Sequence, residues 1–115
     1  MHEASMAGGV LQLVEDCARR EGFVRVTRLR LEVGQLAGVD VRALRFALES
    51  LAPRTLLEGA ALDIDEPPGQ AWCLRCALTV ALPRHGMACP HCGSHQLQAT
   101  QGTQMRVVDM QVEDN

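Results

Sequence analysis

Four of the five cysteines form two short pairs whose spacing is typical of a tetrahedral metal site. Cys73 and Cys76 enclose two residues, Cys89 and Cys92 enclose two more, and twelve residues separate the pairs. Each pair can direct two sulfurs at one ion, and four soft thiolates suit zinc, which brings no redox chemistry of its own. The pattern therefore predicts zinc held by these four cysteines, with two disulfides as the alternative.

The first three residues, Met1-His2-Glu3, contain the groups for a different kind of metal site. A free amine, the imidazole of His2 and two successive backbone amides can surround one square-planar cation, which suits divalent nickel or copper. A bulky residue at position 2 disfavours removal of the initiator methionine, so we expect Met1 to keep its amine in place. A histidine near a terminus is more often a solvated side chain, and these residues alone leave that interpretation open.

The composition excludes several classes of function. All eleven basic residues are arginine, so the chain has no lysine for a Schiff base or a phosphate-binding loop. Residues 71–100 contain two arginines and no acidic residue, whereas the chain as a whole has a net charge of −3. With Trp72 as its one aromatic residue, this mildly basic segment is neither basic nor aromatic enough to make nucleic acid the leading partner. No apolar run reaches the roughly eighteen residues of a membrane span.

The setting expected for the chain is reducing and cytoplasmic. The first residues have neither the basic leader nor the apolar core of a secretory signal. Thiols stay reduced in that setting, which favours metal binding over disulfides at the two cysteine pairs.

Hydrophobic periodicity predicts two helices. Apolar residues recur at helical spacing from near the N-terminus to about Arg20, with Cys17 among them as a buried thiol, and Gly22 provides the stop. Asp40 is placed to cap a second helix that continues through Ser50 and ends at Pro53.

Alternating residues predict three strands, at 23–33, 60–65 and 105–112, with a bulge or a later strand start near Thr27. The last strand cannot bury itself alone, so we expect it to join the other two in one sheet. The predicted fold class is α+β, a three-stranded sheet with two helices and an inserted zinc-ribbon subdomain. The predicted domains are a body of residues 1–69 plus 101–115 and a ribbon insertion of residues 70–100.

The whole chain resembles the HypA/HybF family of hydrogenase nickel metallochaperones. The resemblance rests on Met1-His2-Glu3, Val33-Gly34-Gln35-Leu36, Leu57-Glu58-Gly59-Ala60, Cys73, Cys76, Cys89-Pro90 and Cys92-Gly93. It implies that His2 is the main nickel ligand, with Met1 and Glu3 contributing through amine, backbone or side chain. It also implies structural zinc on the four cysteines. The chain departs from the family pattern at Ala4 and Gln35, neither of which is a proposed ligand.

The same resemblance implies a carrier rather than an enzyme. Nickel would pass to the large subunit of a NiFe hydrogenase, with a nickel-handling GTPase as intermediary and with neither nucleic acid nor membrane as a partner. Whether the chain forms a homodimer stays open. One alternative is a zinc-ribbon module that binds nucleic acid or a protein complex, and another is a redox enzyme, for which no substrate site is evident. For His85, His91 and His95, polar surface is favoured over a second ion site or a pH sensor.

Overall fold

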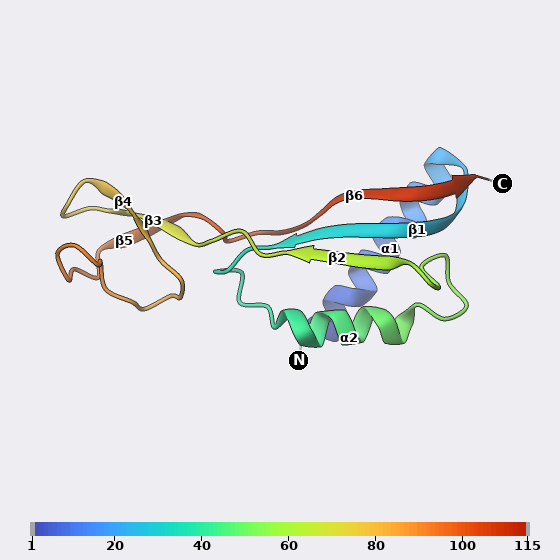
Figure 1. The fold of residues 1–115 in the computed structure, drawn as a ribbon, viewed down its shortest axis with the longest axis horizontal. Helices are drawn as coiled ribbons and strands as arrows, with labels where there is room; N and C mark the ends of the chain where they lie inside the picture. Colours follow the sequence, from blue (N-terminus) through green and yellow to red (C-terminus); the bar gives the residue numbers. More distant parts are fainter. Residues whose placement is uncertain (1, 115) are drawn as a thin grey trace. The chain divides into compact units, whose positions relative to one another are not determined.

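The structure, a computed structural model, describes residues 2–114. Within these residues the chain forms two helices and two three-stranded sheets (Figure 1). It divides into two compact units. The helical unit consists of Met1–Leu31, Val39–Ile64 and Val107–Asn115, and the ribbon unit consists of Glu32–Gly38 and Asp65–Arg106. No described helix is long and apolar enough to cross a membrane.

The first helix, α1 (His2–Glu21), has the extent that its apolar periodicity predicts. Ala7, Val10 and Val14 recur at intervals of three and four and are buried on one face. The helix ends at Gly22, which has a φ of +85° and donates its N–H to the carbonyl of Ala18 at 2.8 Å. Glycine adopts this left-handed conformation without steric penalty, so it terminates the helix cleanly.

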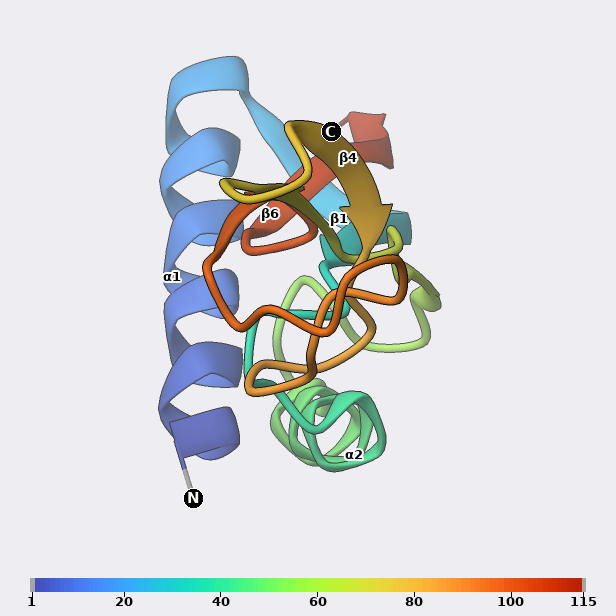
Figure 2. The ribbon, with the colours of Figure 1, turned by 90° about the vertical axis from the view of Figure 1, so that its left-hand side faces the viewer.

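The second helix, α2 (Val41–Leu51), begins at the predicted cap. The carboxylate of Asp40 accepts hydrogen bonds from the backbone N–H groups of Arg42 and Ala43, two donors that have no partner inside the helix. Leu44 and Leu48 are buried, and α2 packs against α1. Figure 2 shows α1 from the side and α2 nearly end-on, so the two helices cross at a steep angle.

The sheet of the three predicted strands has the order β2-β1-β6, which confirms the predicted fold class. Its strands are β1 (Phe23–Val33), β2 (Ala61–Asp65) and β6 (Met105–Asp114). The strand β1 starts at Phe23, and its burial changes phase between Val26 and Leu29, where the sequence places an irregularity. The core of the helical unit contains Ala7, Val10, Val14, Phe23, Val26, Leu29, Leu31, Leu44, Leu48 and Leu57.

Charged residues on the sheet pair across neighbouring strands. Arg28 of β1 pairs with Asp63 of β2, and Arg30 of β1 pairs with Asp109 of β6. These side chains are between two-fifths and three-fifths exposed. The acidic residues of β2 therefore belong to a solvated face of the strand, and Asp63 forms an ion pair with Arg28.

The ribbon unit contains a second antiparallel sheet with the order β4-β3-β5. Its strands are β3 (Gln70–Cys73), β4 (Leu78–Ala81) and β5 (Leu97–Gln101). The buried core of this unit contains Leu36, Ala71, Cys73, Val80, Leu82 and Cys89. Leu36 comes from the connection between β1 and α2, so residues distant in the sequence complete the ribbon core.

Backbone contacts fix residues 34–36 within the ribbon unit. Gly34 donates its N–H to the carbonyl of Gln104 at 2.8 Å, and Leu36 donates to the carbonyl of Gly102 at 2.7 Å. A Cβ at position 34 would lie 2.1 Å from the carbonyl oxygen of Gly102, so only glycine permits this approach. The close crossing explains why Leu36 is buried although it follows a strand in an irregular segment.

Candidate metal centre

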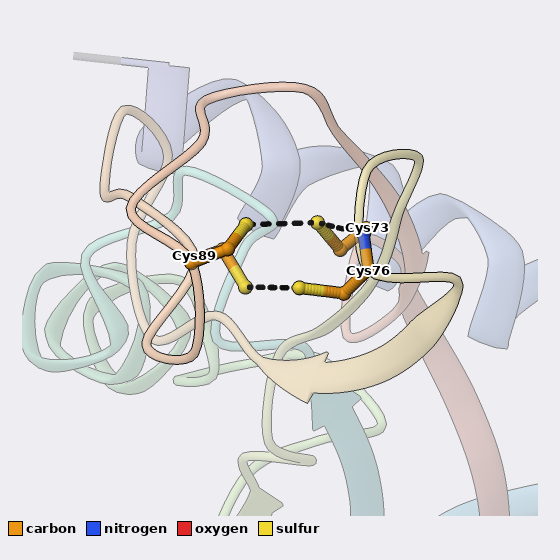
Figure 3. Close-up of side chains that lie close together, drawn as sticks. Cys73, Cys76 and Cys89 are labelled. Carbon is orange, nitrogen blue, oxygen red and sulfur yellow. Dashed lines mark hydrogen bonds between the residues drawn. The ribbon is translucent and has the colours of Figure 1, made fainter.

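The four paired cysteines meet in the ribbon unit with the geometry of a tetrahedral site. Their sulfur atoms all lie within 4.8 Å of one another, and Figure 3 shows those of Cys73, Cys76 and Cys89 turned toward a common centre. The Sγ atoms of Cys73 and Cys92 are 3.7 Å apart, and those of Cys76 and Cys89 are 3.9 Å apart. A tetrahedron with zinc–sulfur bonds of about 2.3 Å has edges of about 3.8 Å. The donor set therefore fits zinc.

Both cysteine pairs have the same backbone geometry, which aims the two sulfurs of each pair. Ala77 donates its N–H to the carbonyl of Cys73 at 2.8 Å, and Gly93 donates to that of Cys89 at 2.9 Å. Ala77 and Gly93 both have positive φ, 56° and 76°. The first sulfur of each pair also accepts a backbone hydrogen bond, from Cys76 in one pair and from His91 in the other. The first pair lies in the turn of the β3–β4 hairpin.

The electrostatics of the four sulfurs favour a cation between them. Burial raises the pKa of Cys89, but hydrogen bonds from the backbone N–H groups of Cys92 and His91 outweigh it and lower that pKa to about 6. The pKa of Cys76 is raised to about 12, first by a hydrogen bond with Cys92 and then by burial. Neighbouring thiolates repel one another, so once one thiol has ionised the others resist ionisation. A divalent ion removes this conflict and displaces the remaining protons.

All five cysteines are free thiols, so the structure holds neither disulfide of the alternative interpretation. Cys17 of α1 is half-buried rather than fully buried, and its sulfur lies 3.3 Å from a guanidinium nitrogen of Arg20. Cys17 lies at the edge of the apolar face of α1, and helical periodicity alone does not tell a buried position from a half-buried one at that edge.

The three histidines near the second pair are exposed, as the polar-surface interpretation expects. His85 has a specific contact, since its Nε2 lies 3.0 Å from the carbonyl oxygen of Leu36. Within residues 2–114, the four cysteines are the one group of three or more His, Cys, Asp and Glu side chains with ligand atoms this close together.

The predicted nickel residues lie at the start of α1, and Met1 falls outside the described residues. His2 is exposed, with 57% of its side chain accessible, and its Nδ1 is 4.0 Å from Oε2 of Glu3. Glu3 is buried, and its Oε2 accepts a hydrogen bond from the backbone N–H of Asp40 at 3.0 Å. The pKa of Glu3 is lowered to about 2, first by a hydrogen bond from the amino terminus and then by the one from Asp40.

Comparison with known proteins identifies the family. Residues 1–112 match the family described as HypA, hydrogenase/urease nickel incorporation, metallochaperone. This chain belongs to the HypA family. It is 67% identical over 114 residues to hydrogenase maturation factor HypA of Polaromonas naphthalenivorans, with 99% of each chain covered. It is 63% identical over 115 residues to the factor of the same name from Cupriavidus necator, covering 100% of this chain and 97% of the relative.

Solved structures show the same fold. The solution structure of the Ni metallochaperone HypA from Helicobacter pylori has a TM-score of 0.70 and 23% identity, with 100% of both chains covered. A second solution structure, of HypA protein, has a TM-score of 0.69 and 25% identity, covering 100% of this chain and 98% of that one. HypA proteins are metallochaperones and maturation factors rather than catalysts, so this chain is not an enzyme.

Spacing found the four cysteines, but it did not find the residues that support them. Leu36 lies far from the cysteine pairs in the sequence and packs with Cys73 and Cys89 only through the fold. His85 lies between the two pairs in the sequence, but its contact with the carbonyl of Leu36 also depends on the fold. The one local sign of the burial of Leu36 is that a large apolar residue stands between Gly34 and Gly38, in a segment that otherwise resembles a turn. The bond between Glu3 and Asp40 has no sequence signature.

Proposed function

We propose that this chain binds Ni(II) at Met1, His2 and Glu3 and delivers it to the large subunit of a NiFe hydrogenase during maturation. Membership in the HypA family over residues 1–112 carries this proposal, because the matched segment includes all three residues. The relatives at 67% and 63% identity are named hydrogenase maturation factors, which favours hydrogenase over other nickel enzymes as the destination. A nickel-handling GTPase is the proposed intermediary.

The chemistry at the start of α1 supports nickel. The backbone N–H groups of His2 and Glu3 belong to the first turn of α1, whose donors take no part in the i→i−4 hydrogen bonds that hold a helix together. They can give up a proton to a metal without breaking the helix. Together with the terminal amine and the exposed imidazole of His2, they provide the nitrogen-rich planar field that Ni(II) prefers.

The same position supports release of the metal to a partner. The N-terminus of a helix has about half a positive charge, which opposes a bound cation and so favours its release. The negative charge of Glu3 beside it offsets part of this effect, so that the metal can still bind. His2 is exposed, so a partner's ligand can replace it without unfolding the core. A carrier needs such an accessible and exchangeable site.

The four cysteines are proposed to hold structural zinc, because four thiolates leave no open position for a substrate or water. We propose a division in which residues 1–69 plus 101–115 bind nickel and residues 70–100 bind zinc. We also propose a reducing, cytoplasmic location, because thiols there stay available to a metal ion.

A transfer assay tests the delivery step. The zinc-containing chain, loaded with one equivalent of Ni(II), is mixed with nickel-free hydrogenase large subunit and the GTPase, and nickel in the separated large subunit is measured. We expect wild type to transfer more nickel than the same concentration of free Ni(II) in the presence of a competing chelator. The His2→Ala variant should give no more than free Ni(II). Equal transfer from wild type and His2→Ala would contradict the proposal.

A further inference from the structure

Glu3 has an unusual place for a charged residue. Within residues 2–114 it is the one charged side chain that is buried, at 7% exposure. Its Oε2 accepts the backbone N–H of Asp40 at 3.0 Å and faces Nδ1 of His2 at 4.0 Å. A single carboxylate oxygen therefore lies between the exposed imidazole and the other helix of the unit.

The bond to Asp40 connects the starts of two helices. Asp40 is the N-cap of α2, and Glu3 lies in the first turn of α1. Both helix N-termini present positive partial charge to this region, which a carboxylate stabilises. The bond is part-buried because its acceptor, Glu3, is buried although Asp40 is exposed. If Glu3 turned away, its carboxylate would lose this hydrogen bond, which is unfavourable.

We propose that Glu3 is a positioning residue, whose carboxylate ties the first turn of α1 to the cap of α2 and so holds His2 in the geometry that receives nickel. Glu3 then contributes to the metal through its backbone nitrogen, and its carboxylate remains with Asp40. This inference rests on the proposed nickel site and specifies which part of Glu3 serves it. Supporting groups of this kind usually act by orienting the ligand that they touch.

Two substitutions separate positioning from ligation. Glu3→Gln keeps an oxygen that can accept the N–H of Asp40, whereas Glu3→Ala removes it. Nickel is titrated calorimetrically into tagless wild type and both variants, and the visible absorption of the bound Ni(II) is recorded. We expect Glu3→Gln to keep nearly wild-type affinity and an unchanged absorption band. Glu3→Ala should bind about 10- to 100-fold more weakly, as loss of a supporting group does in other metal sites.

Val10→Ala is the matched control for stability. Val10 is buried in the same helix, so its truncation loosens α1 without touching the bond between Glu3 and Asp40. We expect a lower unfolding temperature for Val10→Ala with unchanged nickel affinity at a temperature where all variants are folded. Loss of affinity in Val10→Ala as large as in Glu3→Ala would reduce Glu3 to a general stabilising role and overturn the inference.

Other outcomes also overturn it, in distinguishable ways. If Glu3→Gln loses affinity as Glu3→Ala does and its absorption band moves, the carboxylate is itself a ligand. If both Glu3 variants bind nickel as wild type does, the side chain does not position the site. Equal affinity of wild type and His2→Ala would instead remove the nickel site itself, and with it this role of Glu3.

Discussion

Single residues decide how each cysteine pair aims its sulfurs. Ala77 and Gly93 occupy equivalent left-handed positions after the two pairs, and a side chain there costs about 1–2 kcal/mol. We expect Ala77→Gly to stabilise the ribbon unit by about 1 kcal/mol and Gly93→Ala to destabilise it by a similar amount. The rate of zinc transfer to a chromogenic chelator measures both. Faster zinc loss from Ala77→Gly than from wild type would contradict this geometry.

Replacing one cysteine should remove zinc without unfolding the helices. Cys92→Ser is expected to lower the zinc content well below the roughly one ion per chain that a closed four-thiolate site holds. Cys17→Ser is the matched control, because Cys17 lies in α1 and should leave zinc content unchanged. Metal analysis and far-ultraviolet circular dichroism provide the readouts. Full zinc retention by Cys92→Ser would argue against the site.

At the scale of single residues, the four paired cysteines could be predicted from the sequence, but the residues that contact the two sites through the fold could not. Two-residue spacing is a local property, so it identified the four sulfurs from the sequence alone. Glu3 accepts a hydrogen bond from Asp40, 37 residues away in the chain, and no periodic pattern encodes this contact. Its role at the nickel site, like that of His2, stays a prediction.

At the scale of the elements, ion pairs connect neighbouring strands of the sheet. A hydrogen bond from Arg30 to Asp109 lowers the pKa of Asp109 below its usual value, which is about 3.9. A carboxyl group with a lowered folded pKa stabilises the folded state above its unfolded pKa, and that contribution disappears as the pH falls through the folded pKa. The pairing of β1 with β6 should therefore weaken in acid.

The substitution Asp109→Asn tests this contribution. We expect a lower unfolding temperature than wild type at pH 7, with a difference that shrinks as the pH falls below about 4. Asp65→Asn, on the exposed end of β2, is the control and should change the unfolding temperature less. Thermal unfolding is followed by circular dichroism between pH 3 and 7. All variants carry Cys92→Ser and are zinc-free, so that loss of zinc in acid does not contribute to the difference. A difference that is constant with pH would contradict the assignment.

Helices and strands were largely predictable because their signals are local. Asp40 and Gly22 mark helix ends through side-chain capping and positive φ, and the change of phase in β1 is visible in the sequence. The strands of the ribbon unit were not predicted individually, because they are only four or five residues long and have no clear alternation. Their antiparallel pairing, of β3 with β4 and of β3 with β5, is seen only in the structure.

At the scale of the whole molecule, the ribbon unit is completed by residues outside the predicted insertion. Leu36 packs with Cys73 and Cys89 in one buried cluster, so it should support zinc retention although it lies outside residues 70–100. We expect Leu36→Ala to destabilise the ribbon unit by about 2–5 kcal/mol and to speed zinc loss to a chelator. Leu78→Ala is the control, because Leu78 is 48% exposed. Equal zinc loss from the two variants would show that Leu36 does not support the site.

The central claim is that nickel binds at the start of the chain. Calorimetric titration of Ni(II) into tagless wild type, His2→Ala and an N-terminally extended form, all with zinc bound, tests it most directly. We predict a site in wild type whose affinity falls as the pH is lowered, because protons compete for its nitrogen ligands. The site should be lost in both other forms, since the extension converts the terminal amine into a peptide nitrogen. Equal affinity in all three forms would contradict the claim and shift nickel binding to other groups, such as His85, His91 and His95.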